Sequence, residues 1–161
     1  MNMHISTAYT PAAERLVEIA KHARRLLDSL TPAADLILRL WVANAFFQSG
    51  LTKIESFEST IALFTYEYRV PLLSPELAAY AGTFTELFFP ALLAVGLTGR
   101  LSAFVLFVFN IIAVVSYPGL NEVGLEQHQV WGLMLLLIIC RGPGRLSLDH
   151  MIARRLGLQG R

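Results

Sequence analysis

The sequence is short of charge. Asp, Glu, Lys and Arg make up only 16% of its 161 residues, whereas about 25% is typical of a soluble domain. The formal net charge is +1, and no cluster of lysines and arginines is dense enough to follow a phosphate backbone. These features exclude a disordered tail and a nucleic-acid-binding protein. Hydrophobic residues make up 55% of the chain, which suits a membrane.

Cysteine and several functional motifs are also missing. The single cysteine, Cys140, cannot form a disulfide, a redox-active pair or a cysteine-based zinc site within one chain. His128 is the only histidine near an apolar segment, which argues against a haem held by two facing histidines. Glu122 and Glu126 beside His128 are a weak basis for a metal site, and we predict none. Glycine-rich phosphate loops, a nucleophile elbow and a cleavable signal peptide are not recognisable.

Four segments are long and apolar enough to cross a membrane, which takes about 20 helical residues for a hydrocarbon core of about 30 Å. Thr31-Pro32 and Ser74-Pro75 place a capping side chain before a first-turn proline and predict helix starts. The fourth segment reaches spanning length only if it starts near Val123, and a later start near Gln127 is the open alternative. We predict an all-α membrane protein, a four-transmembrane-helix bundle with spans at about 33–52, 76–97, 100–117 and 124–141.

Amphipathic helices are predicted at both termini. In residues 1–31, the stretch 11–30 has leucines and isoleucines at helical spacing opposite a basic face. This pattern favours a helix lying in the interface of an anionic leaflet, although packing against a soluble partner or another copy of the chain would bury the same face. Residues 142–161 form a second such tail. The predicted bundle therefore occupies 32–141.

Basic residues are distributed unequally between the two sides of these spans. Lys53 and Arg69 lie on one side, and Arg39 lies within the first span. Because cytoplasmic segments carry an excess of Lys and Arg, we predict a multi-pass protein of the bacterial inner (plasma) membrane with both termini in the cytoplasm. The ten basic residues on the side that holds the termini are Arg15, Lys21, Arg24, Arg25, Arg100, Arg141, Arg145, Arg154, Arg155 and Arg161.

Arg39 and Glu86 are ionisable residues inside the predicted spans, where charge is costly unless it is paired or hydrated. From the expected helix starts, Arg39 lies about 9 Å deep and Glu86 about 15 Å deep, at nearly the level of Asn44 and Asn110. One interpretation is a polar pocket in which Glu86, within reach of Arg39, is an acid, base or ligand contact. The other is a structural Arg39–Glu86 clamp with interhelical amide hydrogen bonds.

A second group of polar and aromatic residues is expected at the boundary of the spans. Lys53, Tyr80, His128 and Trp131 belong to it. Aromatic residues at this level commonly anchor a helix in the interface. Together with Asn44 and Asn110, the four residues are also our candidates for a pocket that holds a quinone or another small ligand.

Several short motifs resemble the DoxX family of small four-helix membrane proteins. The similarity covers about residues 33–149, and its most specific element is the closing Gly-Pro-Gly-Arg-Leu-Ser-Leu-Asp of residues 142–149. The other matching motifs are Leu38-Arg39-Leu40, Gly50-Leu-Thr-Lys53, Val70-Pro71, Glu86 and Gly96-Leu-Thr-Gly-Arg100.

The resemblance implies a bacterial inner-membrane protein linked to respiratory or redox partners. The family takes its name from a subunit associated with a quinol oxidase and with thiosulfate:quinone oxidoreductase. Other members are similar to accessory proteins of soluble oxidoreductases or of systems that make metal-binding peptides. The positions carried over from the family are Arg39, Gly50, Lys53, Glu86, Gly96 and Arg100.

We therefore predict a redox-associated membrane subunit with quinone or quinol as its small ligand; as an enzyme, it would be a quinone-linked oxidoreductase subunit. Two alternatives stay open. One is a non-catalytic scaffold or accessory protein for a soluble partner or a metal-peptide system, and the other is a small-solute or metal-related transporter. Besides the lipid bilayer, we expect a protein partner or a homo-oligomer.

Overall fold

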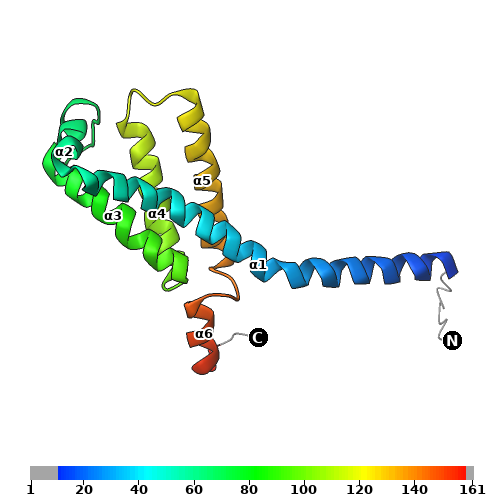
Figure 1. The fold of residues 1–161 in the computed structure, drawn as a ribbon. Helices are drawn as coiled ribbons and strands as arrows, with labels where there is room; N and C mark the ends of the chain where they lie inside the picture. Colours follow the sequence, from blue (N-terminus) through cyan, green and yellow to red (C-terminus); the bar gives the residue numbers. More distant parts are fainter. Residues whose placement is uncertain (1–10, 159–161) are drawn as a thin grey trace, which may run out of the picture.

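The computed structural model describes residues 11–158 of the chain, and every regular element in that range is a helix (Figure 1). Four of these helices, α1, α3, α4 and α5, are long and apolar enough to cross a membrane, so the predicted all-α, four-span fold class is confirmed. In chain order the helices are α1 (Pro11–Glu55), α2 (Phe57–Tyr66), α3 (Pro75–Val95), α4 (Gly99–Ser116), α5 (Glu122–Arg141) and α6 (Leu148–Arg155).

Helix α1 is continuous where the sequence predicts a helix start. Pro32 lies inside this helix of 45 residues, and Thr31 Oγ1 donates a hydrogen bond to the carbonyl of Leu27, 3.1 Å away. A proline removes one backbone donor, but the helix resumes directly and changes direction in this region (Figure 1). The first part of α1 projects away from the bundle as an arm, and the second part packs against α3.

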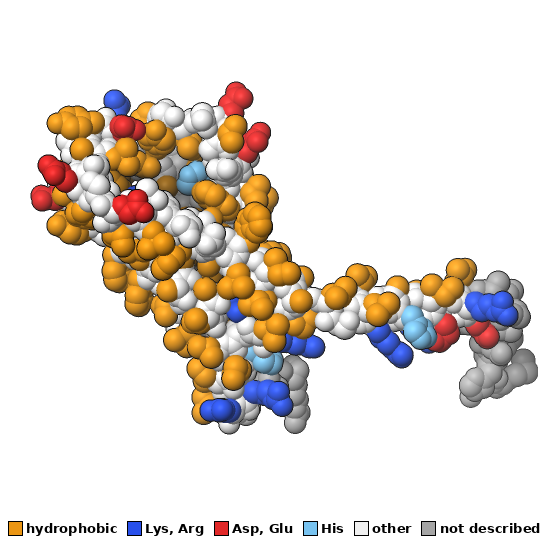
Figure 2. Space-filling view, in the orientation of Figure 1, with side chains coloured by type: hydrophobic (Ala, Val, Ile, Leu, Met, Phe, Trp, Pro, Cys, Tyr) orange, Lys and Arg blue, Asp and Glu red, His pale blue; other side chains and the backbone are white. Residues whose placement is uncertain are grey.

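The arm has two different faces. Its apolar side chains are 47–67% exposed, because no other helix covers them. In Figure 2 they form one edge of the arm, on the same side as the bundle, while most of its charged and histidine side chains form the opposite edge. The structure thus describes the predicted amphipathic helix as the first half of α1. The apolar residues of the arm are Leu16, Val17, Ile19, Leu26, Leu27 and Leu30.

The core of the bundle is apolar and lies between α1, α3, α4 and α5. Val42, Leu93, Leu106 and Leu135, one from each helix, are completely buried. Most other large hydrophobic side chains on these helices point outward, as in a bundle whose surroundings are lipid. On the face drawn in Figure 2, hydrophobic side chains cover much of the side of the bundle.

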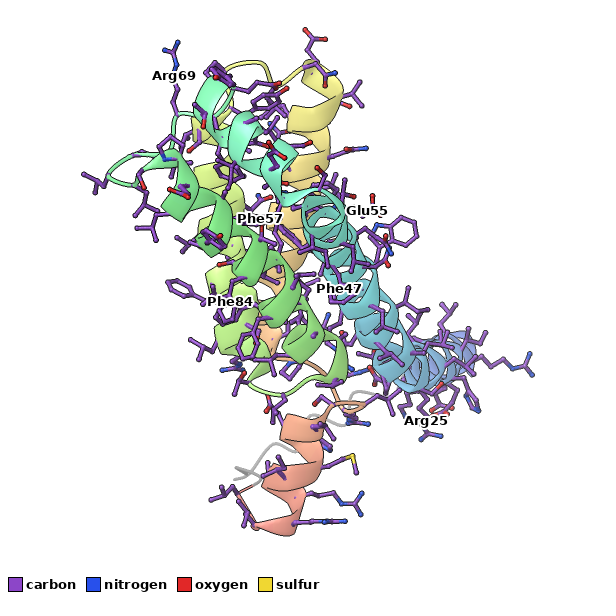
Figure 3. The ribbon with its side chains drawn as sticks, turned by 60° about the vertical axis from the view of Figure 1, so that its left-hand side comes forward. Arg25, Phe47, Glu55, Phe57, Arg69 and Phe84 are labelled. Atoms are coloured by element: carbon purple, nitrogen blue, oxygen red, sulfur yellow. The ribbon has the colours of Figure 1, made fainter. Side chains whose placement is uncertain are left out.

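The two ends of the bundle differ. At one end, which we call the α2 end, α2 covers the ends of α1 and α3, with Glu55 and Phe57 at the junction of α1 and α2 (Figure 3). Thr60 Oγ1 donates to the carbonyl of Lys53, 2.9 Å away, and ties α2 to α1. The α6 end carries α6 and the arm (Figure 1). There both carboxylate oxygens of Asp149 accept hydrogen bonds from backbone N–H groups at the start of α4.

Candidate functional site

A buried ion pair joins α1 to α3 near the α2 end. Lys53 Nζ lies 2.6 Å from Glu86 Oε2, and the two side chains are only 13% and 7% exposed. Ser49 Oγ donates to Glu86 Oε1 at 3.0 Å and accepts from Lys53 Nζ at 2.9 Å. Ser49 and Lys53 are four residues apart, so they lie on the same face of α1. The three side chains form one connected polar group.

A glycine allows this close contact between the helices. A Cβ atom on Gly50 would lie 2.9 Å from Leu87 Cδ2 and 3.1 Å from the carbonyl carbon of Glu86. Any larger residue would therefore push α3 away from α1. Gly50 brings the backbone of α3 near enough for the carboxylate of Glu86 to reach both Ser49 and Lys53.

The ion pair borders a cavity of about 430 Å³, within the usual size range of small-ligand pockets. Its walls come from the α2 end of the bundle and are mainly apolar, with Phe64, Val70 and Phe109 among them. Polar groups are few among the lining residues. Ser116 Oγ is buried without a hydrogen-bond partner in the described structure. The polar residues that line the cavity are Lys53, Tyr68, Thr85, Glu86 and Ser116.

Tyr68 is a neutral hydrogen-bond donor at the cavity. Its ring stacks between Phe64 and Tyr117, at centroid distances of 4.8 and 4.9 Å. Burial raises the pKa of the Tyr68 hydroxyl, and the negative charge of Glu86 raises it further. Since an unperturbed tyrosine already titrates near pH 10, the hydroxyl of Tyr68 keeps its proton at neutral pH.

The structure does not pair Arg39 with Glu86, so the predicted clamp is wrong. Arg39 lies ten residues before Ser49, about 15 Å further along α1 toward the α6 end. Its guanidinium donates to the carbonyls of Pro143 and Leu146, and the residue is 2% exposed. Arg39 thus holds the loop after α5 and lies outside the cavity that Glu86 borders.

Three of the predicted pocket residues form a contact between α4 and α5. Asn110 Nδ2 donates to the carbonyl of His128 at 3.0 Å, and His128 Nδ1 lies 2.7 Å from Asn110 Oδ1. The ring of Trp131 meets that of His128 edge-on at 5.0 Å. With both polar groups of the Asn110 amide engaged, these residues join two helices and do not line the cavity beside Glu86.

Asn44 and Tyr80 also lie elsewhere. Asn44 is exposed on α1 and lines an open groove between α1 and α5. Tyr80 is 57% exposed, and its ring contacts that of Phe57 in a tilted arrangement with centroids 4.5 Å apart. Of the six predicted pocket residues, only Lys53 therefore joins Glu86. Within residues 11–158 no three His, Cys, Asp or Glu residues lie close enough together to hold a metal ion.

Several residues of the cavity and of the polar group beside it were not predicted from the sequence. Ser49 carried a signal, because it precedes Lys53 by one helical turn and shares its face. Thr85 precedes Glu86 directly, and Tyr68 is an aromatic residue in the segment between the first two predicted spans. Ser116 had no signal, since nothing in the order of residues along the chain places the end of α4 beside Glu86.

Comparisons with known proteins identify a family for this chain. A family model for DoxX matches residues 34–118, a range that contains Ser49, Lys53, Glu86 and Ser116. A protein of Haemophilus influenzae described as "Uncharacterized protein" is 32% identical over 126 residues, which cover 74% of this chain and 83% of that protein. No solved structure matches the chain.

Proposed function

Because the chain belongs to the DoxX family of membrane proteins, we propose that it binds the head group of a quinone or quinol in the cavity beside Glu86 and serves a redox partner. The observation that carries this proposal is the buried Lys53–Glu86 pair at the edge of an apolar cavity of about 430 Å³. A quinone needs apolar walls for its ring and tail, and a few polar groups for its two oxygens.

The polar groups of the cavity suit both redox forms. Lys53 and Tyr68 are donors for the carbonyl oxygens of a quinone. The carboxylate of Glu86 is an acceptor for the hydroxyl of a quinol. Oxidation of a quinol to a quinone releases two electrons and two protons. In this proposal Glu86 takes up one hydroxyl proton, the second proton leaves to water, and a partner oxidoreductase accepts the electrons.

The apolar core favours binding over transport. A transporter needs polar, water-accessible groups along its path through the membrane. Between the level of Glu86 and the α6 end, however, the centre of the bundle consists of packed hydrophobic residues such as Val42, Phe46 and Leu93, which are at most 4% exposed. The cavity beside Glu86 therefore suits a bound ligand that enters from the lipid.

A scaffold function is the second candidate, because of the groove between α1 and α5. This groove of about 790 Å³ is lined by Trp41, Asn44, Gln127 and Trp131. The amide of Asn44 is exposed within a span, where a neighbouring helix could supply hydrogen bonds. Cysteine crosslinking at Asn44 in native membranes tests this function: a crosslinked product supports a helix in the groove, and its absence argues against one.

The proposed cellular location is the bacterial inner membrane, with the α6 end in the cytoplasm. The basic residues of the arm, of the end of α5 and of α6 support this orientation, since cytoplasmic segments are rich in Lys and Arg. The cavity beside Glu86 then lies nearer the opposite, periplasmic side of the membrane.

Binding of ubiquinone-1 and menadione to the purified, quinone-depleted protein tests the proposed function. Glu86→Gln leaves the buried Lys53 cation unpaired and should lower the free energy of unfolding by about 3 to 5 kcal/mol. The double variant Lys53→Met with Glu86→Gln removes both charges and should recover most of this loss. If the pair serves the ligand, the double variant is stable but binds quinone at least tenfold more weakly than the wild type.

The control is Tyr80→Phe, which changes an exposed aromatic residue at the same end of the bundle and outside the cavity. It should bind quinone as the wild type does. A double variant that is stable and binds both quinones with wild-type affinity would show that Lys53 and Glu86 only hold α1 and α3 together.

A further inference from the structure

A second, polar cavity lies at the α6 end of the bundle, about 15 Å or more from the level of Glu86. Its volume is about 660 Å³. It is bounded by the middle of α1 around Pro32, by the start of α4, by the end of α5 and by the loop that connects α5 to α6. Among its lining residues are three arginines, Arg100, Arg141 and Arg145.

The carboxylates around this cavity already have partners. Asp149 accepts hydrogen bonds from the backbone N–H groups of Thr98 and Gly99, at 2.8 and 2.7 Å. Asp28 lies 3.7 Å from Arg24, and Asp35 lies 3.9 Å from Arg141. All three lining aspartates are therefore engaged, and one of the three arginines is paired with Asp35.

Arg100 and Arg145 are the two lining arginines that are not paired with a carboxylate in the described structure. Within residues 11–158, Arg145 makes no hydrogen bond or ion pair, and Arg100 makes one long hydrogen bond of 3.4 Å to the carbonyl of Cys140. The guanidinium of Arg100 lies over Gly142, where a Cβ atom would be 3.4 Å from Arg100 Nε. Gly142 has φ = +90°, a conformation that glycine adopts readily. The cavity thus has two arginines without a carboxylate partner, and the backbone at Gly142 beside them carries no side chain.

The position of this cavity matches the depth of lipid head groups. The residues that line it belong to the ends of the spans and to the middle of α1, where the arm leaves the bundle (Figure 1). The apolar edge of the arm faces the side of the bundle, and its charged edge faces away (Figure 2). An amphipathic helix in this orientation rests at the membrane interface. A phospholipid phosphate can therefore reach the arginines from the bilayer, with its acyl chains against exposed apolar residues such as Leu101.

We propose that this cavity binds the phosphate group of an anionic phospholipid through Arg100 and Arg145. Guanidinium groups donate two hydrogen bonds in a planar fork that fits phosphate oxygens. Basic pockets between transmembrane helices near the head groups are a recurring form of lipid recognition. The proposal is independent of the quinone function, because none of these residues touches the cavity beside Glu86.

Native mass spectrometry of the full-length protein tests the proposal, with phosphatidylglycerol and phosphatidylcholine of identical acyl chains as probes. The wild type should retain one phosphatidylglycerol at least tenfold more strongly than phosphatidylcholine. Arg100→Gln with Arg145→Gln should remove this preference. Arg154→Gln with Arg155→Gln is the matched control, because it removes the same charge from α6, outside the cavity, and should keep the preference.

Two further measurements keep the test decisive. Arg145→Ala alone removes a side chain without partners, so it should fold normally and still weaken phosphatidylglycerol binding severalfold. Inorganic phosphate is the third probe: binding of phosphate alone, lost in the Arg100 and Arg145 variants, would assign the site to a soluble phosphate group. Equal retention of the two lipids by the wild type, or equal losses in the cavity variants and the α6 control, would overturn the proposal.

Discussion

At the scale of single residues, Arg39 and Lys53 show how two cations on one helix take different roles. Lys53 is paired with a carboxylate beside a cavity. Arg39 is fully enclosed and donates to two backbone carbonyls in the loop after α5. Arg39 thus holds the loop after α5 in place, and Glu86 is the group that we propose exchanges a proton.

Arg39→Met should destabilise the protein without affecting quinone binding. The substitution leaves the carbonyls of Pro143 and Leu146 without their donors, at a cost of about 2 to 4 kcal/mol in the free energy of unfolding. Unfolding in lipid-free detergent by titration with dodecyl sulfate measures this change. Arg145→Met is the control, because Arg145 belongs to the same loop and has no partner in the described structure. Loss of quinone binding at unchanged stability would instead place Arg39 in the ligand site.

At the scale of elements, α1 combines two functions in one helix. Its second half packs against α3 and provides Ser49 and Lys53. Its first half is exposed from Glu14 to Leu30. Within the described structure this half is therefore stabilised only by the helix that it extends. The change of direction near Pro32 separates the part that crosses the bundle from the part that leaves it (Figure 1).

Deletion of residues 11–30 should leave an inserted and folded bundle. Residues 13–30, whose burial the structure describes, include no buried residue, and the remaining spans keep their own apolar length. We expect extraction from membranes to require detergent as for the wild type, and the thermal midpoint in detergent to change by no more than about 3 °C. A deleted form that is no longer found in membranes would show that the arm is needed for insertion.

At the scale of the whole molecule, the structure is a bundle with two chemically different ends. The α2 end encloses an apolar cavity with one buried ion pair, whereas the α6 end is polar and rich in arginine. Figure 2 shows most of the described basic side chains at the α6 end and on the arm, and acidic side chains gathered at the opposite end. This asymmetry underlies the proposed orientation in the membrane.

Cysteine labelling tests that orientation. In a Cys140→Ser background, a cysteine at Glu58 on α2 should react with a membrane-impermeant maleimide in intact cells. A cysteine at Arg154 on α6 should react only after the membrane is opened. Both positions are exposed, so failure to react reports the membrane barrier and not burial. Labelling of Arg154 and protection of Glu58 in intact cells would reverse the proposed topology.

The sequence by itself determined the class of protein. Long apolar runs interrupted by turn residues are sufficient to predict four spans, because the backbone in lipid must satisfy its own hydrogen bonds within helices. Helical periodicity likewise predicted the amphipathic stretch before the first span. Glu86 could be selected as the central acid because a carboxylate in a hydrophobic segment is costly. These are properties of composition and local spacing.

Only the tertiary structure decided which cation reaches Glu86. The sequence estimate assumed spans with level ends, which brought Arg39 near Glu86. In the structure Gly50 lies level with Glu86, and α3 extends beyond the end of α1, where α2 packs against it. This offset moves Lys53 to the carboxylate and Arg39 to the loop after α5. The same packing brings Tyr68 and Ser116 to the cavity, because contacts between helices depend on their relative shift and not on spacing along one chain.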